Sequence, residues 1–335
     1  MARRGLTYLL GAVVLIALML LSTGYGTTSI PAPDVVQSVM LGLGLAEGEV
    51  APVHRIVFDL RLPRALFAAV IGAGLGIVGV VLQTTTRNDL ADPFLFGLSS
   101  GAAAGAVFVI TVTGDILGFW TLPLAAFTGG IIASAVVLGL VHSLRTSAPE
   151  KLILAGLAVS FLFAAITNYL IFAGDSRAAH SVIFWMLGGL GLARWAGFPL
   201  ICAGLVLIFV YTLYRARWLD ALLTGDVTAT TLGVPVQRLR FSMFFIAALA
   251  TAVFVSVAGV IGFIGLMVPH IARGITGPLH RHLIPTAALV GACLLTGSDI
   301  VSRIILAPQE LPVGIVTTSI GSLFVFLLLY RTARS

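Results

Sequence analysis

The chain of 335 residues is a succession of long apolar runs separated by short polar loops. An α-helix needs about 20 such residues to cross the roughly 30 Å hydrocarbon core of a bilayer. Ten runs fit this length, at residues 6–25, 63–83, 93–113, 120–142, 151–173, 195–214, 241–259, 261–276, 283–302 and 313–330. Alternating strand patterns bounded by turn residues are missing. The sequence therefore predicts an all-α integral membrane protein of about ten transmembrane helices, forming a single domain over residues 1–335.

Composition supports the membrane interpretation and indicates an orientation. Hydrophobic residues make up 59% of the chain and charged residues only 10%, whereas soluble domains carry about 25% charged residues. The net charge is +6, but the arginines are dispersed among the loops, which is typical of membrane topology rather than of nucleic-acid binding. Most of them fall on the inner side if both termini are cytoplasmic. Omitting the short span 261–276 would place Arg273 and Arg281 outside, so the charges favour ten spans.

The amino terminus and the two cysteines have simple structural interpretations. Residues 1–20 begin like a signal peptide, but the apolar run is long and no A-x-A cleavage site follows, so we interpret it as an uncleaved first span. Cys202 and Cys293 fall inside apolar spans, where a thiol behaves as a small hydrophobic group. We expect no metal site in this chain.

The charged residues bear on the energy source. Every carboxylate lies in a predicted loop or near a span end, whereas proton-coupled carriers need an ionisable residue within the membrane. A sodium-coupled carrier that uses backbone carbonyls stays possible. The only lysine, Lys151, follows Glu150 and does not belong to a phosphate-binding loop. If ATP drives transport, ATP and Mg are therefore bound by a separate subunit, and this chain carries no cofactor and is not an enzyme.

The longest predicted inner loop, residues 215–240, offers a contact site for such a subunit. Thr224 or Asp226 is placed to cap a short helix, and Gly233 with Pro235 is placed to end it. A short rigid helix between two spans suits the transmission of force. From these residues alone, a surface helix without a partner is an equally good interpretation.

Several motifs, in order along nearly the whole chain, resemble one transporter family. They are LRLPRALFAAVIGAGLGIVGVVLQTTTRNDLADPFLFGLSSGAAAGAV at 60–107, KLILAGLAVS at 151–160, FWMLGGLGLARW at 184–195, TGDVTATTLGVPV at 224–236, GFIGLMVPHIAR at 262–273, SDIVSR at 298–303 and ELPVGIVTTSIGSLFVFLLL at 310–329. Together they resemble the permease subunits of bacterial ABC importers for iron siderophores, haem and cobalamin. This resemblance implies a multi-pass protein of the bacterial inner membrane.

The resemblance also implies partners and contact residues. It implies a second permease subunit, two cytoplasmic ATPase subunits and a periplasmic or lipoprotein substrate-binding protein. The family's coupling residues, which contact the ATPase, fall on Gly225, Asp226, Ala229, Leu232, Gly233 and Val234. Its docking arginines, which meet glutamates of the binding protein, fall on Arg61, Arg64 and Arg303. The alternative is that these arginines anchor span ends at the lipid headgroups.

The gate and the path are also implied by the resemblance. The cytoplasmic gate falls on the loops 88–93 and 146–151, with Asn88, Leu90, Ala148 and Pro149 as gate residues. The path is expected along the fifth span and a short helix at the outer mouth, 181–190, which cannot cross a bilayer. Candidate path residues are Ser160, Asn168, Phe172, Trp185 and Met186, although an interfacial anchor fits Trp185 as well.

The identity of the substrate is less constrained. We favour an iron siderophore because it is the commonest substrate in this family. Haem and cobalamin remain alternatives, and the run FWMLGGLG at 184–191 resembles the cobalamin type equally well. His180 and Met186 offer only a weak indication of haem ligation. The rival from another class is an ion-coupled carrier that works without an ATPase.

Overall fold

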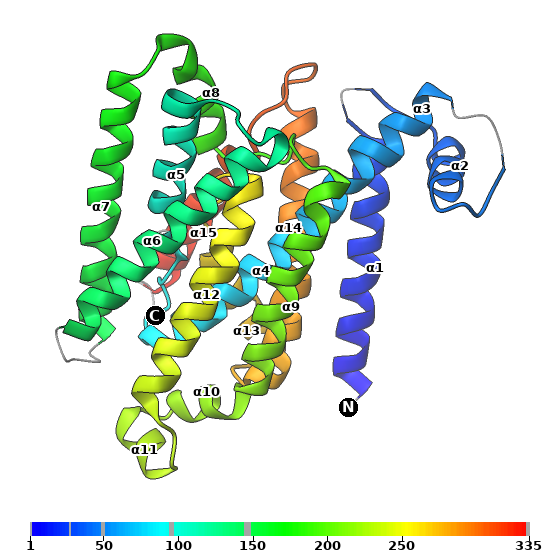
Figure 1. Ribbon diagram of the computed structural model, residues 1–335. Helices are drawn as coiled ribbons and strands as arrows, with labels where there is room; N and C mark the ends of the chain where they lie inside the picture. Colours follow the sequence, from blue (N-terminus) through cyan, green and yellow to red (C-terminus); the bar gives the residue numbers. More distant parts are fainter. Residues whose placement is uncertain (1, 27, 48–50, 94–96, 144–148, 333–335) are drawn as a thin grey trace.

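The computed structural model describes residues 2–26, 28–47, 51–93, 97–143 and 149–332. Within these ranges the chain is built of helices and contains no strand, which confirms the predicted all-α architecture. Figure 1 shows the long helices side by side in one bundle. The long helices are α1 (Ala2–Gly24), α4 (Leu62–Thr86), α6 (Thr121–Ser143), α7 (Pro149–Ala173), α9 (Phe198–Tyr214), α12 (Val236–Ala258), α14 (His280–Ile304) and α15 (Val313–Thr332).

Shorter elements connect or complete these helices. They are α2 (Ala32–Gly42), α3 (Pro52–Arg55), the π-helix η1 (Ile56–Arg61), α5 (Leu98–Phe108) with the π-helix η3 (Val109–Thr113), the 3₁₀ turns η4 (Gly118–Trp120) and η5 (Trp195–Gly197), α8 (Ser176–Met186), α10 (Ala216–Leu222), α11 (Asp226–Thr231) and α13 (Ile264–Thr276). The helix α2 lies in a loop for which the sequence predicted no helix. It follows Pro31, whose fixed φ suits a helix start, and it buries Val35.

Each of the ten predicted spans corresponds to a helix. In the described part of the chain, eight helices are long and apolar enough to cross a membrane. The other two predicted spans are shorter: α5 continues through η3 as the apolar segment Leu98–Thr113, and α13 covers 13 residues. The predicted outer helix at 181–190 is observed as α8, which ends earlier, at Met186. Gly188 adopts a φ of +69° and turns the chain, and the N–H of Gly189 donates to the carbonyl of Ala258 at 2.8 Å.

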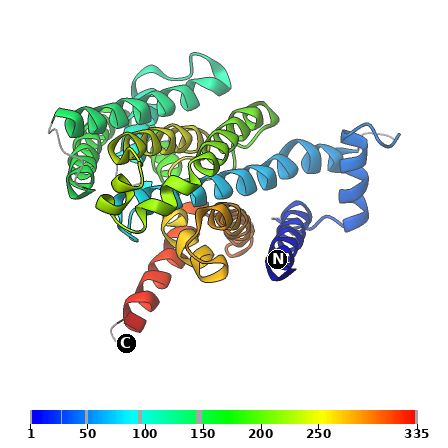
Figure 2. The same ribbon diagram turned by 90° about the horizontal axis from the view of Figure 1, so that it is seen from below.

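The helix α4 is the centre of the bundle. Together with α3 and η1 it forms a continuous helical segment of 35 residues, and 89% of its most apolar window is buried. Figure 2 shows α4 crossing the middle of the molecule with other helices on both sides. Glycines allow this close packing, because a Cβ at Gly72 would collide with the carbonyl of Gly291 in α14, and one at Gly79 with that of Gly265 in α13. Small residues at helix contacts are the usual means of packing in lipid, where apolar contacts with the bilayer are equally available.

Different short helices lie at the two ends of the bundle. The loop 215–240 forms α10, α11 and the start of α12, and Figure 1 shows α10 and α11 below the bundle. We call this the α10–α11 end. Helices α2, α3 and α8 lie at the opposite end, which we call the α8 end. The start of α1 lies toward the α10–α11 end. The side of the membrane that each end faces stays a prediction.

Candidate functional site

A cavity of about 570 Å³ lies between α5, α7, α8 and α15. Three of the five predicted path residues line it, namely Ser160, Asn168 and Met186. Ser160 and Asn168 are eight residues apart on α7, a spacing that places them on the same face of a helix. Trp185 lines a separate cavity of about 390 Å³. The side chain of Phe172 is 90% exposed and is not part of either lining.

The larger cavity is uncharged and mainly apolar, with several hydroxyl groups and one side-chain amide in its lining. Among the described residues that line it, none is acidic or basic. Its hydroxyl groups include several that the sequence analysis did not single out: Ser99, Ser100, Thr167, Thr318 and Ser319. The sequence does contain a signal for these residues, because Ser99–Ser100 and Thr318–Ser319 are adjacent hydroxyl residues inside apolar runs. The hydroxyl and amide groups can donate and accept hydrogen bonds, but the lining offers no charge to hold a ligand tightly, so it suits the passage of a bulky molecule better than its tight capture.

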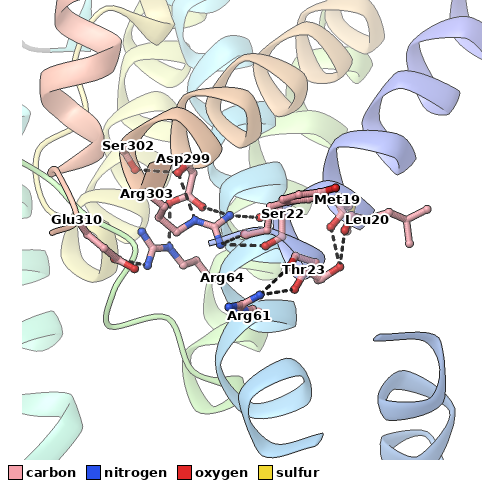
Figure 3. Close-up of polar contacts among 12 residues, drawn as sticks. Met19, Leu20, Ser22, Thr23, Arg61, Arg64, Asp299, Ser302, Arg303 and Glu310 are labelled. Atoms are coloured by element: carbon pink, nitrogen blue, oxygen red, sulfur yellow. Dashed lines mark hydrogen bonds and ion pairs between the residues drawn. The ribbon is translucent and has the colours of Figure 1, made fainter. Parts of the chain in front are cut away.

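The three predicted docking arginines come together near the α8 end. Figure 3 shows Arg61 and Arg303 directed at the end of α1, while Arg64 lies between Asp299 and Glu310. Arg61 donates to the carbonyls of Thr23 and Gly24 at 3.1 and 3.0 Å. Arg303 donates to the carbonyls of Ser22 and Tyr25 at 2.9 and 3.0 Å. The last carbonyls of a helix have no partner within the helix, and these guanidinium groups supply the missing donors for α1.

This arrangement occupies the docking arginines within the chain. Arg61 is 8% exposed and Arg303 only 2%. The Nε atom of Arg64 lies 2.9 Å from a carboxylate oxygen of buried Asp299, and its Nη1 atom lies 2.7 Å from that of Glu310, whose side chain is 40% exposed. Docking by the three arginines stays a prediction. Docking through Arg61 and Arg303 would require the carboxylates of a partner to replace the hydrogen bonds that these two arginines already make to α1 and the residue after it.

The predicted coupling residues lie on and beside α11. Ala229 and Val234 are buried, whereas Leu232 is 67% exposed. Gly225 and Gly233 adopt φ values of +107° and +82°, as the turn predicted at Gly233 requires. The predicted capping is wrong: Gly225 is the N-cap residue and makes no side-chain cap, Thr224 donates to the carbonyl of Ala221, and the carboxylate of Asp226 binds Arg240 instead.

An exposed apolar residue on α11 was missed by the sequence analysis. Val227 is 81% exposed, more than Leu232, which follows the same short helix directly. Both belong to the loop at the α10–α11 end. Their side chains are therefore accessible to another protein at that end of the bundle.

The predicted gate loop follows α4 directly. Arg87 ends α4 in the left-handed conformation, with a φ of +52°. The side chain of Asn88 accepts a hydrogen bond from the N–H of Leu90 at 2.9 Å and so closes a tight turn that leaves Leu90 47% exposed. The second pair of gate residues is less defined. Pro149 is the first residue of α7, and Ala148 lies outside the described residues.

Known proteins with related sequences are transport permeases. Residues 14–331 match the model of the FecCD transport family. The Fe(3+) dicitrate transport system permease protein FecD of Escherichia coli is 38% identical over 278 residues, covering 83% of this chain and 86% of that protein. The cobalamin import system permease protein BtuC of Halobacterium salinarum is 38% identical over 310 residues, covering 91% and 80%. The hemin transport system permease protein HmuU of Yersinia pestis is 37% identical over 280 residues, covering 82% and 83%.

The fold agrees with these likenesses. A solved structure assigned to the metal-chelate type of ABC transporters, and described as inward-facing, matches with a TM-score of 0.83 at 29% identity, covering 97% of this chain and 99% of that one. The helical bundle and the relatives define a multi-pass membrane permease of the ABC importer class. The chain belongs to the FecCD transport family.

Proposed function

We propose that this chain is the membrane-spanning subunit of an ATP-driven importer that carries an iron–siderophore chelate across the bacterial inner membrane. The observation that carries this proposal is the uncharged cavity of about 570 Å³ inside a FecCD-family bundle, whose mainly apolar lining carries several hydroxyl groups. Its volume falls in the usual range of small-molecule sites, about 300–1,000 Å³. Because the lining carries no charge, tight binding of the substrate is the task of a separate delivery protein in this proposal. Iron is the cargo in the names of the dicitrate relative and of the iron(3+)-hydroxamate permease FhuG of Bacillus subtilis.

The importer requires partners at both ends of this chain. The exposed Val227 of α11 and the exposed Leu232 directly after it support an ATPase contact at the α10–α11 end, which then faces the cytoplasm. ATP and Mg are bound by that ATPase. A second permease subunit completes the path, and a periplasmic or lipoprotein binding protein docks at the α8 end. Arg64 and Glu310 form the more accessible part of the arginine cluster there, so binding-protein carboxylates engage Arg64 first and then Arg61 and Arg303.

The gate loop separates the cavity from the cytoplasm in this proposal. Exposed Leu90, held by the turn at Asn88, closes the path together with the segment around Ala148 and Pro149. The small side chains of this second segment allow the two loops to approach closely. Opening of the gate then requires a movement of the residues that follow α4.

Reconstitution tests this function. The permease is placed in proteoliposomes with its ATPase and binding protein, and uptake of a radioactive iron siderophore is measured with ATP inside. We expect uptake only when the ATPase, ATP and binding protein are all present. Accumulation by the permease alone under a proton or sodium gradient would instead show an ion-coupled carrier. ATP-dependent uptake of haem or cobalamin, but not of the siderophore, would support the importer function and show that the substrate assignment is wrong.

A further inference from the structure

The last turn of α4 is buried and polar, unlike the apolar turns before it. Gln83, Thr84 and Thr85 are 2%, 4% and 1% exposed, respectively. Each of these residues makes a polar contact with a different helix. A buried polar group is costly unless it is hydrogen-bonded, so these contacts fix which helices meet at the end of α4. The gate loop, residues 88–93, begins three residues after Thr85.

The first contact joins α10 to Thr84 through His280 of α14. The His280 side chain is fully buried. Its Nδ1 atom lies 2.7 Å from a carboxylate oxygen of Asp220 in α10, and its Nε2 atom lies 2.9 Å from the hydroxyl of Thr84. The N–H of His280 donates to the same carboxylate oxygen at 2.8 Å. A carboxylate oxygen only accepts, so Nδ1 carries the hydrogen, and in the neutral ring Nε2 accepts from Thr84.

The charge state of Asp220 supports this contact. Burial on its own would raise the pKa of the Asp220 carboxyl, but the hydrogen bonds that the side chain and backbone of His280 donate outweigh burial and lower that pKa. The carboxylate is therefore ionised at neutral pH, which is the form that accepts both hydrogen bonds.

The second contact joins α11 to Thr85 through Arg240 of α12. Arg240 is 7% exposed, and its two terminal nitrogens each lie 2.8 Å from one oxygen of the Asp226 carboxylate. Its Nε atom donates to the carbonyl of Thr85 at 2.9 Å. A two-point contact between a planar guanidinium group and a carboxylate fixes orientation as well as distance. Asp226 is the first residue of α11, and Arg87, directly before the gate loop, also comes within 4.0 Å of it.

These contacts converge on one end of a closely packed helix. Every residue of α4 from Ile71 to Thr86 is buried. If α10 and α11 move Thr84 and Thr85, the close packing of α4 therefore leaves this helix little room to bend. The nearest element able to change its backbone angles is the loop after Thr86, which starts at the left-handed residue Arg87. On the other side of this loop, Arg273 of α13 binds both Gln83 and Asp89, at 2.8 and 3.1 Å.

We propose that His280 and Arg240 are positioning residues that transmit movement of the coupling loop to the gate loop through Thr84 and Thr85. This inference rests on the proposed function, in which an ATPase moves α10 and α11. We call the two chains of contacts, Asp220–His280–Thr84 and Asp226–Arg240–Thr85, the coupling links. They act on the gate without touching the transported molecule or the nucleotide.

The test uses the permease assembled with its ATPase, with the variant Thr84→Val and two matched controls. Thr84→Val keeps the shape of the side chain but removes the hydroxyl that meets His280. Thr84→Ser restores that hydroxyl. Thr86→Val makes the same chemical change two residues along, where the hydroxyl binds only the carbonyl of Leu82 within α4. Arg240→Lys tests the second link, because an ammonium group cannot contact both Asp226 and Thr85 with the fixed geometry of a guanidinium group.

Two quantities are measured in each variant. The first is the amount of chelate transported per ATP hydrolysed. The second is the labelling rate of a cysteine placed at Leu90, with and without ATP, in a background where Cys202 and Cys293 are replaced. This second quantity reads gate movement without any chelate, so it reports on the coupling links even if the substrate proves to be different. Co-purification of the ATPase confirms that each variant assembles.

The expected result is a loss of coupling with hydrolysis retained. For Thr84→Val and Arg240→Lys, transport per ATP should fall about five-fold or more, and ATP should no longer change the labelling of the Leu90 position. Thr84→Ser and Thr86→Val should behave like the unsubstituted complex. The inference is overturned if ATP changes the labelling rate in both Thr84→Val and Arg240→Lys as much as it does in the unsubstituted complex. An equal loss in Thr86→Val would also overturn it, since the effect would then come from any disturbance of the last turn of α4.

Discussion

Replacing Arg303 with glutamine tests whether the arginine cluster holds the end of α1 in the isolated permease. In the structure this guanidinium group is 2% exposed, donates to the carbonyls of Ser22 and Tyr25, and lies 3.1 Å from the second carboxylate oxygen of Asp299. Glutamine removes the positive charge and is too short to reach all of these acceptors. The carbonyls of Ser22 and Tyr25 would lose these donors, whereas those of Thr23 and Gly24 would keep the hydrogen bonds from Arg61.

The expected loss in the free energy of unfolding follows from the groups that Arg303→Gln leaves without a hydrogen-bond partner. A buried acceptor that loses its hydrogen bond costs about 1–3 kcal/mol, and Arg303→Gln leaves two carbonyls exposed to this loss. The charge of Asp299 remains compensated, because Arg64 still contacts its other oxygen at 2.9 Å, so the full cost of an unpaired buried charge does not apply. We expect a loss of about 3 kcal/mol. At about 2–4 °C per kcal/mol for proteins of moderate size, the melting temperature should fall by at least about 5 °C.

The assay is thermal unfolding of the purified permease in detergent, without the binding protein. Arg55→Gln is the matched control, because Arg55 is an exposed arginine near the same end of the bundle. It should leave the melting temperature unchanged. An Arg303→Gln variant as stable as the control, but unable to bind the binding protein, would refute the structural role. Arg303 would then act only as a docking residue.

Three further variants probe other parts of the molecule. Gly233→Val places a β-branched residue at a φ of +82°, which costs roughly 1–2 kcal/mol or more; ATPase co-purification should fall, and Gly233→Asn should retain most of it. Ser160→Leu narrows the larger cavity and should lower chelate uptake several-fold while the ATPase still assembles, as measured in proteoliposomes. Gly72→Leu collides with the carbonyl of Gly291, so the amount of folded permease in the membrane should drop sharply, with Gly5→Leu, where no atom lies near, as the control.

Much of the fold was predictable because membrane helices have a strong sequence signal. Apolar runs of the right length identified every long helix, and the glycine with Pro235 identified the end of α11. Glycine is the residue that adopts a positive φ without strain, and Gly233 has that conformation. Motif resemblance also singled out Asn88, whose side chain closes a turn, and three residues that line one cavity, Ser160, Asn168 and Met186, although their roles stay predictions.

The partners of the buried polar side chains were decided only by the tertiary structure. His280 meets Asp220, 60 positions away, and Thr84, 196 positions away. In a membrane protein the faces toward lipid and toward the interior are both apolar, so the sequence pattern of a span does not show which face is buried. Arg61 and Arg303 illustrate the result. Their sequence positions suggest span ends open to a partner, but the packing of α1 against α4 and α14 turns their guanidinium groups toward the unsatisfied carbonyls at the end of α1.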